Sequence, residues 1–159
     1  RMRSAFNKDD ASLNVRMKNQ KLLLEIMDDL PFGAGIGMGG GKAKDYAPDA
    51  LISQIPTDSW YVQLWVETGV VGFALYFFIQ IFIIFYGVYI IIYKLKTKII
   101  KGYMTAIVSA LLGMLVAAYG NEIWGQLPNI FILTVCQAFL FTSPKYDREL
   151  IEKEVCKAK

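Results

Sequence analysis

The chain has 159 residues, of which 55% are hydrophobic and 19% charged, and its mean hydropathy is +0.37. Apolar and charged residues must therefore form separate blocks, which is typical of an integral membrane protein that carries a polar portion. The formal net charge of +3 is too small to indicate nucleic-acid binding, and the absence of histidine removes the commonest zinc ligand and general base.

Residues 1–67 form a polar region with eight Lys or Arg and nine Asp or Glu. The pattern predicts an amphipathic helix over about residues 13–30. Its apolar positions are Leu13, Met17, Leu24 and Met27 or Ile26. Pro31 ends this helix, a glycine-rich loop follows over residues 31–44, and we expect an irregular stretch as far as residue 55.

The glycine-rich loop contains Gly35-x-Gly37-x-x-Gly40, which fits the spacing of a dinucleotide-binding fingerprint. That fingerprint needs a strand before it and a helix after it, whereas a helix precedes this loop and an irregular stretch follows. A P-loop is excluded as well, because Ala43 follows Lys42 where Ser or Thr is required. The loop either simply stops the helix or presents backbone N–H groups and Lys42 to a phosphate or sugar.

Three apolar stretches are predicted to cross a membrane between residues 68 and 143. Residues 69–93 contain one clearly polar residue, Gln80, and are long enough to span the hydrocarbon core. Residues 103–119 form a second span that carries small residues on one face. Residues 128–143 reach the lower length limit for a third span, with a re-entrant or interfacial segment as the alternative. Cys136 in this stretch and Cys156 beyond it lack metal or redox spacing, and no disulfide is expected.

Lysines set the expected orientation. The connector at residues 94–102 carries four lysines and no acidic residue, which places it in the cytoplasm by the positive-inside rule. The connector at residues 121–127 has no Lys or Arg and is expected outside, while the tail at residues 144–159 returns to the cytoplasm as a short charged helix. Residues 1–67 are then periplasmic. Because the chain opens on Arg1 within a polar segment, we expect a C-terminal fragment that lacks upstream transmembrane helices.

The segment from Pro56 onward predicts a helix that starts outside the membrane and continues into it, with Thr57 or Asp58 as N-cap. Asp58, Tyr61 and Trp65 fall on one face of that helix. Capping is the commoner role for such an aspartate, but a carboxylate beside aromatic rings also suits a sugar-bearing lipid. Arg16, on the first predicted helix, is by its chemistry alone a solvated residue or a membrane-interface anchor.

Two residue patterns in the sequence resemble motifs of a known protein family. Asp58 and Ser59 are followed by nine residues and then by Gly69-Val70-Val71-Gly72, and the helix with Arg16 leads into Pro31-Phe32-Gly33-Ala34-Gly35. These patterns resemble the O-antigen ligase and polymerase superfamily of bacterial envelope glycan assembly. In its ligase branch a His occupies the position of Asp58, so the aspartate favours a polymerase, or another surface-polysaccharide member, over a lipid A core ligase.

The resemblance implies an all-α integral membrane protein, the C-terminal part of a multi-helix bundle in the bacterial inner membrane, with a large periplasmic loop that contains an amphipathic helix. It implies a metal- and cofactor-independent glycosyltransferase that moves glycan from an undecaprenyl-pyrophosphate carrier to a glycan or lipid acceptor during polysaccharide or lipopolysaccharide synthesis. Arg16 would contact the pyrophosphate and Asp58 would take the acceptor proton. Trp60, Tyr61, Trp65 and Lys42 are the further candidate substrate-binding residues.

Three alternatives stay open. The chain could be an inactive homologue, a portion of a transporter or flippase, or a structural membrane subunit, in which Asp58 caps a helix and Arg16 anchors one. A transporter usually carries charged residues in mid-span, and the predicted spans offer only Gln80 and Gln137. This absence counts against transport.

Overall fold

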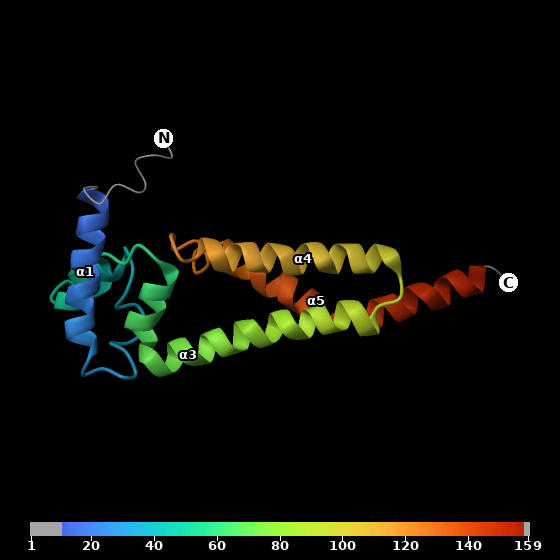
Figure 1. Cartoon of the computed structure of the whole chain (residues 1–159), viewed down its shortest axis with the longest axis horizontal. Coiled ribbons are helices and arrows are strands. Elements are labelled where there is room, and N and C mark those ends of the chain that lie inside the picture. The colour runs from blue at the N-terminus through green and yellow to red at the C-terminus, as the bar shows by residue number, and fades with distance from the viewer. Residues whose placement is uncertain (1–10, 158–159) are drawn as a thin grey trace. The chain divides into compact units, whose positions relative to one another are not determined.

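The computed structural model of the chain describes residues 11–157, and this part is helical with no β-strand. The first ten residues of the predicted periplasmic region and the last two of the predicted tail lie outside the described residues. In chain order the elements are α1 (Ala11–Met27), α2 (Ala43–Tyr46), the 3-10 turn η2 (Leu51–Gln54), α3 (Trp60–Tyr89), the π-helical turn η3 (Ile90–Lys94), α4 (Lys98–Ala117) and α5 (Asn129–Lys157) (Figure 1). The stretch expected to be irregular therefore holds two short helical turns.

The chain divides into two compact units, and α3 contributes to both. The first unit ends at Leu75 and also includes the segment Tyr119–Glu122. Its core brings together α1, the turn η2 and the start of α3. The buried residues of this core are Leu23, Met27, Ile52, Ile55 and Val66.

The buried face of α1 includes only part of the apolar positions named from the sequence. Leu23 and Met27, one turn apart, are buried against Val66, whereas Met17 and Leu24 expose 52% and 56% of their surface. Of the apolar positions named from the sequence, Met27 is thus buried, whereas Met17 and Leu24 lie outside the buried face. Three consecutive leucines, at residues 22–24, offer several faces of nearly equal hydrophobicity, so the sequence does not fix the rotation of this helix.

Helix α3 is broken at Gly69, whose φ of 68° and ψ of −171° are not helical. In an unbroken helix the Val71 N–H would bond the Glu67 carbonyl. Here the Val71 N–H donates to the Pro31 carbonyl at 3.4 Å, and the Glu67 carbonyl accepts the Gly35 N–H at 3.2 Å. The glycine-rich loop thus supplies the hydrogen bonds that the helix gives up, and the predicted continuous helix is in fact interrupted.

Glycine is required on both sides of this contact. A Cβ at Gly69 would collide with the Pro31 carbonyl and the Gly33 nitrogen, and a Cβ at Gly33 would collide with the Glu67 carbonyl. Both residues also have a positive φ, 84° at Gly33 and 68° at Gly69. Only glycine adopts the Gly69 backbone conformation without strain.

We predict that Gly69→Ala lowers the free energy of unfolding by about 2 kcal/mol or more, because it combines backbone strain of roughly 1–3 kcal/mol with a collision against Pro31. Thermal unfolding of the purified protein in detergent measures the loss. The matched control is Gly41→Ala in the same loop, where a Cβ meets no described heavy atom within 4 Å. An equal fall in stability for both variants would contradict the assignment.

The second unit contains the most apolar helices. Among the described residues, two helical stretches are long and apolar enough to cross a membrane, Trp60–Lys94 and Lys98–Ala117. Only 17% of the most apolar part of each stretch is buried within the described chain, so most of its apolar surface is exposed. The two stretches suit membrane association and match the first two predicted spans in position.

Side chains from three helices meet inside the second unit. Ile83 of α3, Val108 of α4 and Leu140 of α5 form a buried cluster. In the same unit, the Gln137 amide donates to the Gln80 carbonyl oxygen at 3.0 Å, so the polar residue of the first predicted span is paired. Such hydrogen bonds contribute to helix association in an apolar medium.

The third predicted span lies on α5, which is not one of the two stretches with span-like length and composition. Its crossing of the membrane stays a prediction. Helix α5 also continues through Pro144 to Lys157, so the tail is not a separate helix. Proline has no N–H to offer the Leu140 carbonyl, and the Ser143 hydroxyl donates to that carbonyl instead, at 2.7 Å. This replacement bond helps to explain why the helix passes the proline.

The Asp147 carboxylate on α5 holds the connector before α4. It is 2% exposed and accepts the N–H groups of Lys96 and Thr97 at 2.8 and 3.0 Å. Burial alone would raise the pKa of Asp147, but these hydrogen bonds, a bond from the Thr97 side chain and the charge of Lys101 together lower it. The ionised carboxylate is therefore the form that stabilises this connector.

We predict that Asp147→Ala destabilises the protein by about 2 kcal/mol or more, because two N–H groups lose their acceptor. Asp147→Asn keeps one acceptor oxygen and should cost less. The folded pKa lies below the ordinary value of 3.8, so the carboxylate stabilises fully above about pH 4 and loses its effect as pH falls through the folded pKa. Unfolding curves between pH 3 and 7 should show the gap between wild type and Asp147→Asn closing below about pH 4; a constant gap would argue against this role.

Candidate functional site

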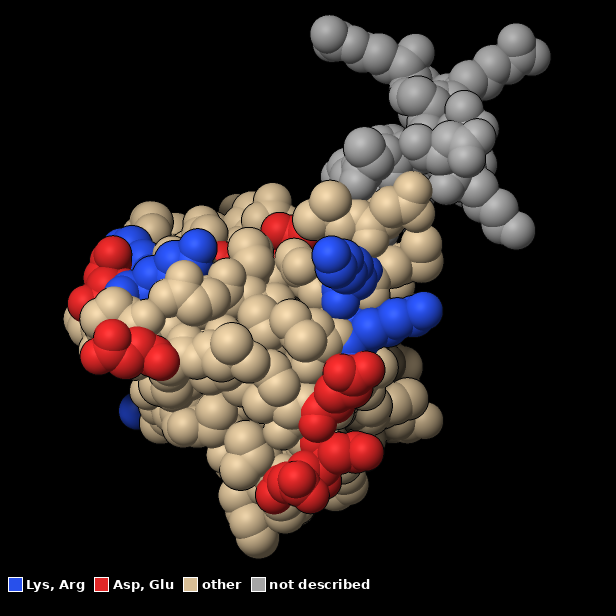
Figure 2. Space-filling model, turned by 90° about the vertical axis from the view of Figure 1, so that its left-hand side faces the viewer, with Lys and Arg blue, Asp and Glu red and all other residues tan. Residues whose placement is uncertain are grey.

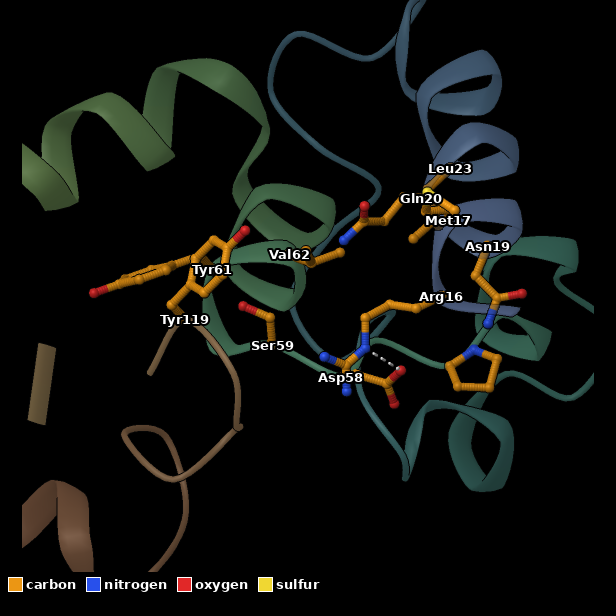
Figure 3. Close-up of a pocket in the computed structure, with 11 residues that line it drawn as sticks. Arg16, Met17, Asn19, Gln20, Leu23, Asp58, Ser59, Tyr61, Val62 and Tyr119 are labelled. Atoms are coloured by element: carbon orange, nitrogen blue, oxygen red, sulfur yellow. Dashed lines mark hydrogen bonds and ion pairs between the residues drawn. The ribbon is translucent and has the colours of Figure 1, made fainter. Parts of the chain in front are cut away.

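The site is built where α1 lies beside the segment that enters α3. Helix α3 begins at Trp60, so Ser59 immediately precedes it, one or two residues later than the predicted caps Asp58 and Thr57. The Arg16 Nε–H of α1 donates to the Asp58 Oδ2 at 3.2 Å, as the dashed line in Figure 3 marks. The two residues singled out independently in the sequence are thus partners in one ion pair.

The ion pair borders a cavity of about 300 Å³ in the first unit. Figure 3 shows side chains of α1 and of the start of α3 around it, with Tyr119 approaching from the connector before α5. The lining combines one cation, one carboxylate, amides, hydroxyls and aromatic rings. Its members are Arg16, Met17, Asn19, Gln20, Leu23, Pro56, Asp58, Ser59, Tyr61, Val62 and Tyr119.

Both members of the ion pair are accessible. The side chains of Arg16 and Asp58 are 42% and 46% exposed. A pair this open is screened by water and contributes at most about 1 kcal/mol to stability. The guanidinium can donate further N–H groups to an incoming anion, since only the Nε–H is engaged with Asp58.

The segment Tyr119–Glu122 completes the site from a distant part of the chain. The Thr57 hydroxyl, on a residue that is 4% exposed, donates to the Glu122 Oε1 at 2.9 Å. The Trp60 N–H donates to the Asn121 carbonyl at 3.3 Å. These contacts hold the residues on either side of Asp58.

A second cavity, of about 580 Å³, shares Tyr61 and Val62 with the first. Its lining is largely apolar and includes Trp65, which also packs against the core of this unit. The ring of Phe73 meets that of Tyr61 edge to face, with centroids 6.4 Å apart. A polar cavity and an apolar cavity therefore adjoin at Tyr61.

The predicted site residues separate into three groups. Arg16, Asp58 and Tyr61 line the polar cavity, and Trp65 lines the apolar one. Lys42 and Trp60 line neither of these two cavities; Lys42 is exposed at the start of α2. The glycine-rich loop around Lys42 lies instead against α3, where Gly39 and Gly40 approach the Gln63 side chain.

Sequence reasoning missed Asn19, Gln20, Tyr119 and Glu122. The amides of Asn19 and Gln20 read as the ordinary polar face of an amphipathic helix. Glu122 lies within the connector at residues 121–127, and Tyr119 lies just before it. The lysine pattern predicts that this connector is on the same side of the membrane as residues 1–67, and this was the only signal for their proximity.

The charged groups on the face of the molecule in Figure 2 do not form a patch of one sign, since acidic and basic side chains both border uncharged surface. Within the described residues, no group of three or more Cys, Asp or Glu side chains is arranged to hold a metal ion. What the polar cavity offers is one guanidinium for an anion, one carboxylate for a proton, and amides and rings for a polyhydroxylated ligand.

Comparison of the chain with protein-family models, with curated proteins and with solved structures gave no match.

We predict that Glu122→Ala destabilises the first unit by about 1–3 kcal/mol, because the buried Thr57 hydroxyl loses its acceptor. Glu122→Gln keeps an acceptor oxygen at the same place and serves as the matched control. Thermal unfolding of both variants in detergent compares them. If Glu122→Gln is as destabilised as Glu122→Ala, then the charge of Glu122, and not its bond to Thr57, accounts for the effect.

Proposed function

We propose that this chain carries the outward-facing site of a glycan transferase of the O-antigen ligase and polymerase type, with polymerisation favoured over transfer to lipid A core. The Arg16–Asp58 pair at the edge of an accessible polar cavity carries this proposal. In this proposal the chain is the C-terminal part of a larger helical bundle in the bacterial inner membrane. The first unit is periplasmic, and the connector at residues 94–102 and the tail are cytoplasmic.

The adjoining cavities suit an amphiphilic donor. A glycan attached to undecaprenyl pyrophosphate has polyhydroxylated, anionic and hydrocarbon parts in that order. The polar cavity offers hydrogen-bonding groups and Arg16, and the apolar cavity beyond Tyr61 offers Trp65 and other apolar side chains. A second lipid-linked glycan or a lipid acceptor supplies the hydroxyl that attacks.

The proposed step is a direct displacement at the anomeric carbon. The acceptor oxygen forms a bond to this carbon while the bond to the pyrophosphate oxygen breaks, and the configuration inverts. Asp58 accepts the proton of the acceptor hydroxyl as general base, and the bond electrons leave with undecaprenyl pyrophosphate. Arg16 binds the departing pyrophosphate through the planar N–H groups of its guanidinium. When the pyrophosphate engages Arg16, it competes with Asp58 for the guanidinium and frees the carboxylate to act.

We predict that Asp58→Asn and Arg16→Ala each reduce glycan transfer about 100-fold or more, the usual effect of losing a general base or a charge contact in the transition state. Arg16→Lys retains the charge but loses the fork of donors, and should restore activity only in part. The measurement is the chain-length distribution formed from a labelled undecaprenyl-pyrophosphate glycan, normalised to the amount of inserted protein.

Matched controls separate this function from a structural ion pair. Lys18→Ala and Lys21→Ala remove exposed cations of α1 that do not line the polar cavity, and both should leave transfer unchanged. The exchange Arg16→Asp with Asp58→Arg rebuilds an ion pair in reverse. Normal activity in this double variant would show that the pair only tethers α1, and normal polymer in both single variants would rule out the proposed transferase site.

A further inference from the structure

A basic cavity lies in the second unit, where the connector between η3 and α4 meets α5. It has a volume of about 420 Å³. Three cationic side chains line it, Lys94 from the end of η3, Lys96 from the connector and Arg148 from α5. The transferase proposal makes no use of this cavity.

The protein positions two of these cations. The Lys94 ammonium lies 6.0 Å from the centre of the Tyr89 ring, and the Arg148 Nε–H donates to the Pro144 carbonyl at 3.3 Å. Neither is paired with a carboxylate in the described structure, whose two ion pairs are Arg16 with Asp58 and Lys145 with Glu149. Both cations are therefore held near the cavity without a carboxylate that neutralises them.

The carboxylates of the cavity do not neutralise the three cations. Asp147 is buried and its oxygens accept the N–H groups of Lys96 and Thr97, so it serves the connector backbone. Glu152 is the remaining acidic residue of the lining and is exposed. With three cations against these two carboxylates, the cavity keeps one net positive charge toward an incoming anion.

The position of the cavity along the chain indicates the class of that anion. Lys94 is the last residue of the apolar stretch Trp60–Lys94. Tyr89 and Tyr93, on the last turns of the same stretch, expose 43% and 72% of their surface, and their rings form a tilted pair. Tyrosines at the end of an apolar helix lie at the level of lipid headgroups, and basic cavities between helices at that level take anionic headgroups.

We propose that this cavity binds the phosphate of an anionic phospholipid, with Lys94, Lys96 and Arg148 as its contacts. Pro144 and Ile151 on α5 give it an apolar side for the glycerol end of the lipid. A bound lipid would join the connector to α5 next to the Asp147 bonds. The inference depends on membrane insertion and not on the transferase activity.

The test is retention of lipid by the purified protein after delipidation in a neutral detergent, counted by native mass spectrometry after addition of phosphatidylglycerol or phosphatidylcholine. Wild type should retain phosphatidylglycerol about tenfold or more over phosphatidylcholine. The triple variant Lys94→Gln, Lys96→Gln, Arg148→Gln should lose this preference. Its unfolding temperature in detergent is measured alongside to show that it is folded.

A second triple variant with the same change of charge is the matched control. Lys98→Gln, Lys145→Gln and Lys153→Gln remove three cations of α4 and α5 that do not line the cavity, and should keep the preference. Equal loss in both triples would show diffuse attraction and overturn the proposal, as would an unchanged preference in the first. Displacement of the lipid by an equal concentration of glycerol phosphate would assign the cavity to a soluble phosphate and overturn the lipid assignment.

Discussion

The first unit depends on an exchange of backbone hydrogen bonds at Gly69. The break in α3 leaves carbonyls that the helix does not use, and the loop after Pro31 donates to them: Ala34 to Val66 at 2.8 Å and Gly35 to Glu67 at 3.2 Å. Because a buried backbone group without a partner costs about 1–3 kcal/mol, loop and break stabilise each other. The docked loop places α1 beside the start of α3, running in the same direction (Figure 1).

The candidate site follows from that docking. Met27, near the loop, packs with Val66, which fixes the two segments at one end. Arg16 and Asp58 lie roughly two to three turns earlier on their segments, so the same alignment brings them together at the other end. The glycines of the sequence pattern and the Arg16–Asp58 pair thus belong to one arrangement. The glycines allow α1 and the start of α3 to lie close together, and this alignment brings the two charged residues into contact.

Sequence reasoning identified what depends on composition and side-chain type. The apolar blocks predicted the positions of α4 and of the apolar part of α3, and Arg16, Asp58 and Tyr61 do line one cavity. It failed where backbone geometry or helix phase decides. Glycine occurs both at breaks in helices and at close contacts within them, so the sequence alone did not indicate that α3 breaks at Gly69. The tail was expected to be a separate short helix, but α5 continues through Pro144, where the hydroxyl of the preceding serine supplies the bond that proline cannot make.

Asp147 and Asp58 differ in their surroundings, and this difference gives the first a structural role and leaves the second available for a chemical one. Asp147 is 2% exposed and its oxygens are committed to the backbone N–H groups of Lys96 and Thr97, so it cannot leave them without loosening the connector. Asp58 is 46% exposed and meets a single guanidinium that is itself open to solvent. The Asp147 carboxylate stabilises the fold because its hydrogen bonds to the connector outweigh the cost of burying its charge. The Asp58–Arg16 pair contributes at most about 1 kcal/mol to the stability of the fold. Because the fold does not need this pair for its stability, a ligand can separate the two charges.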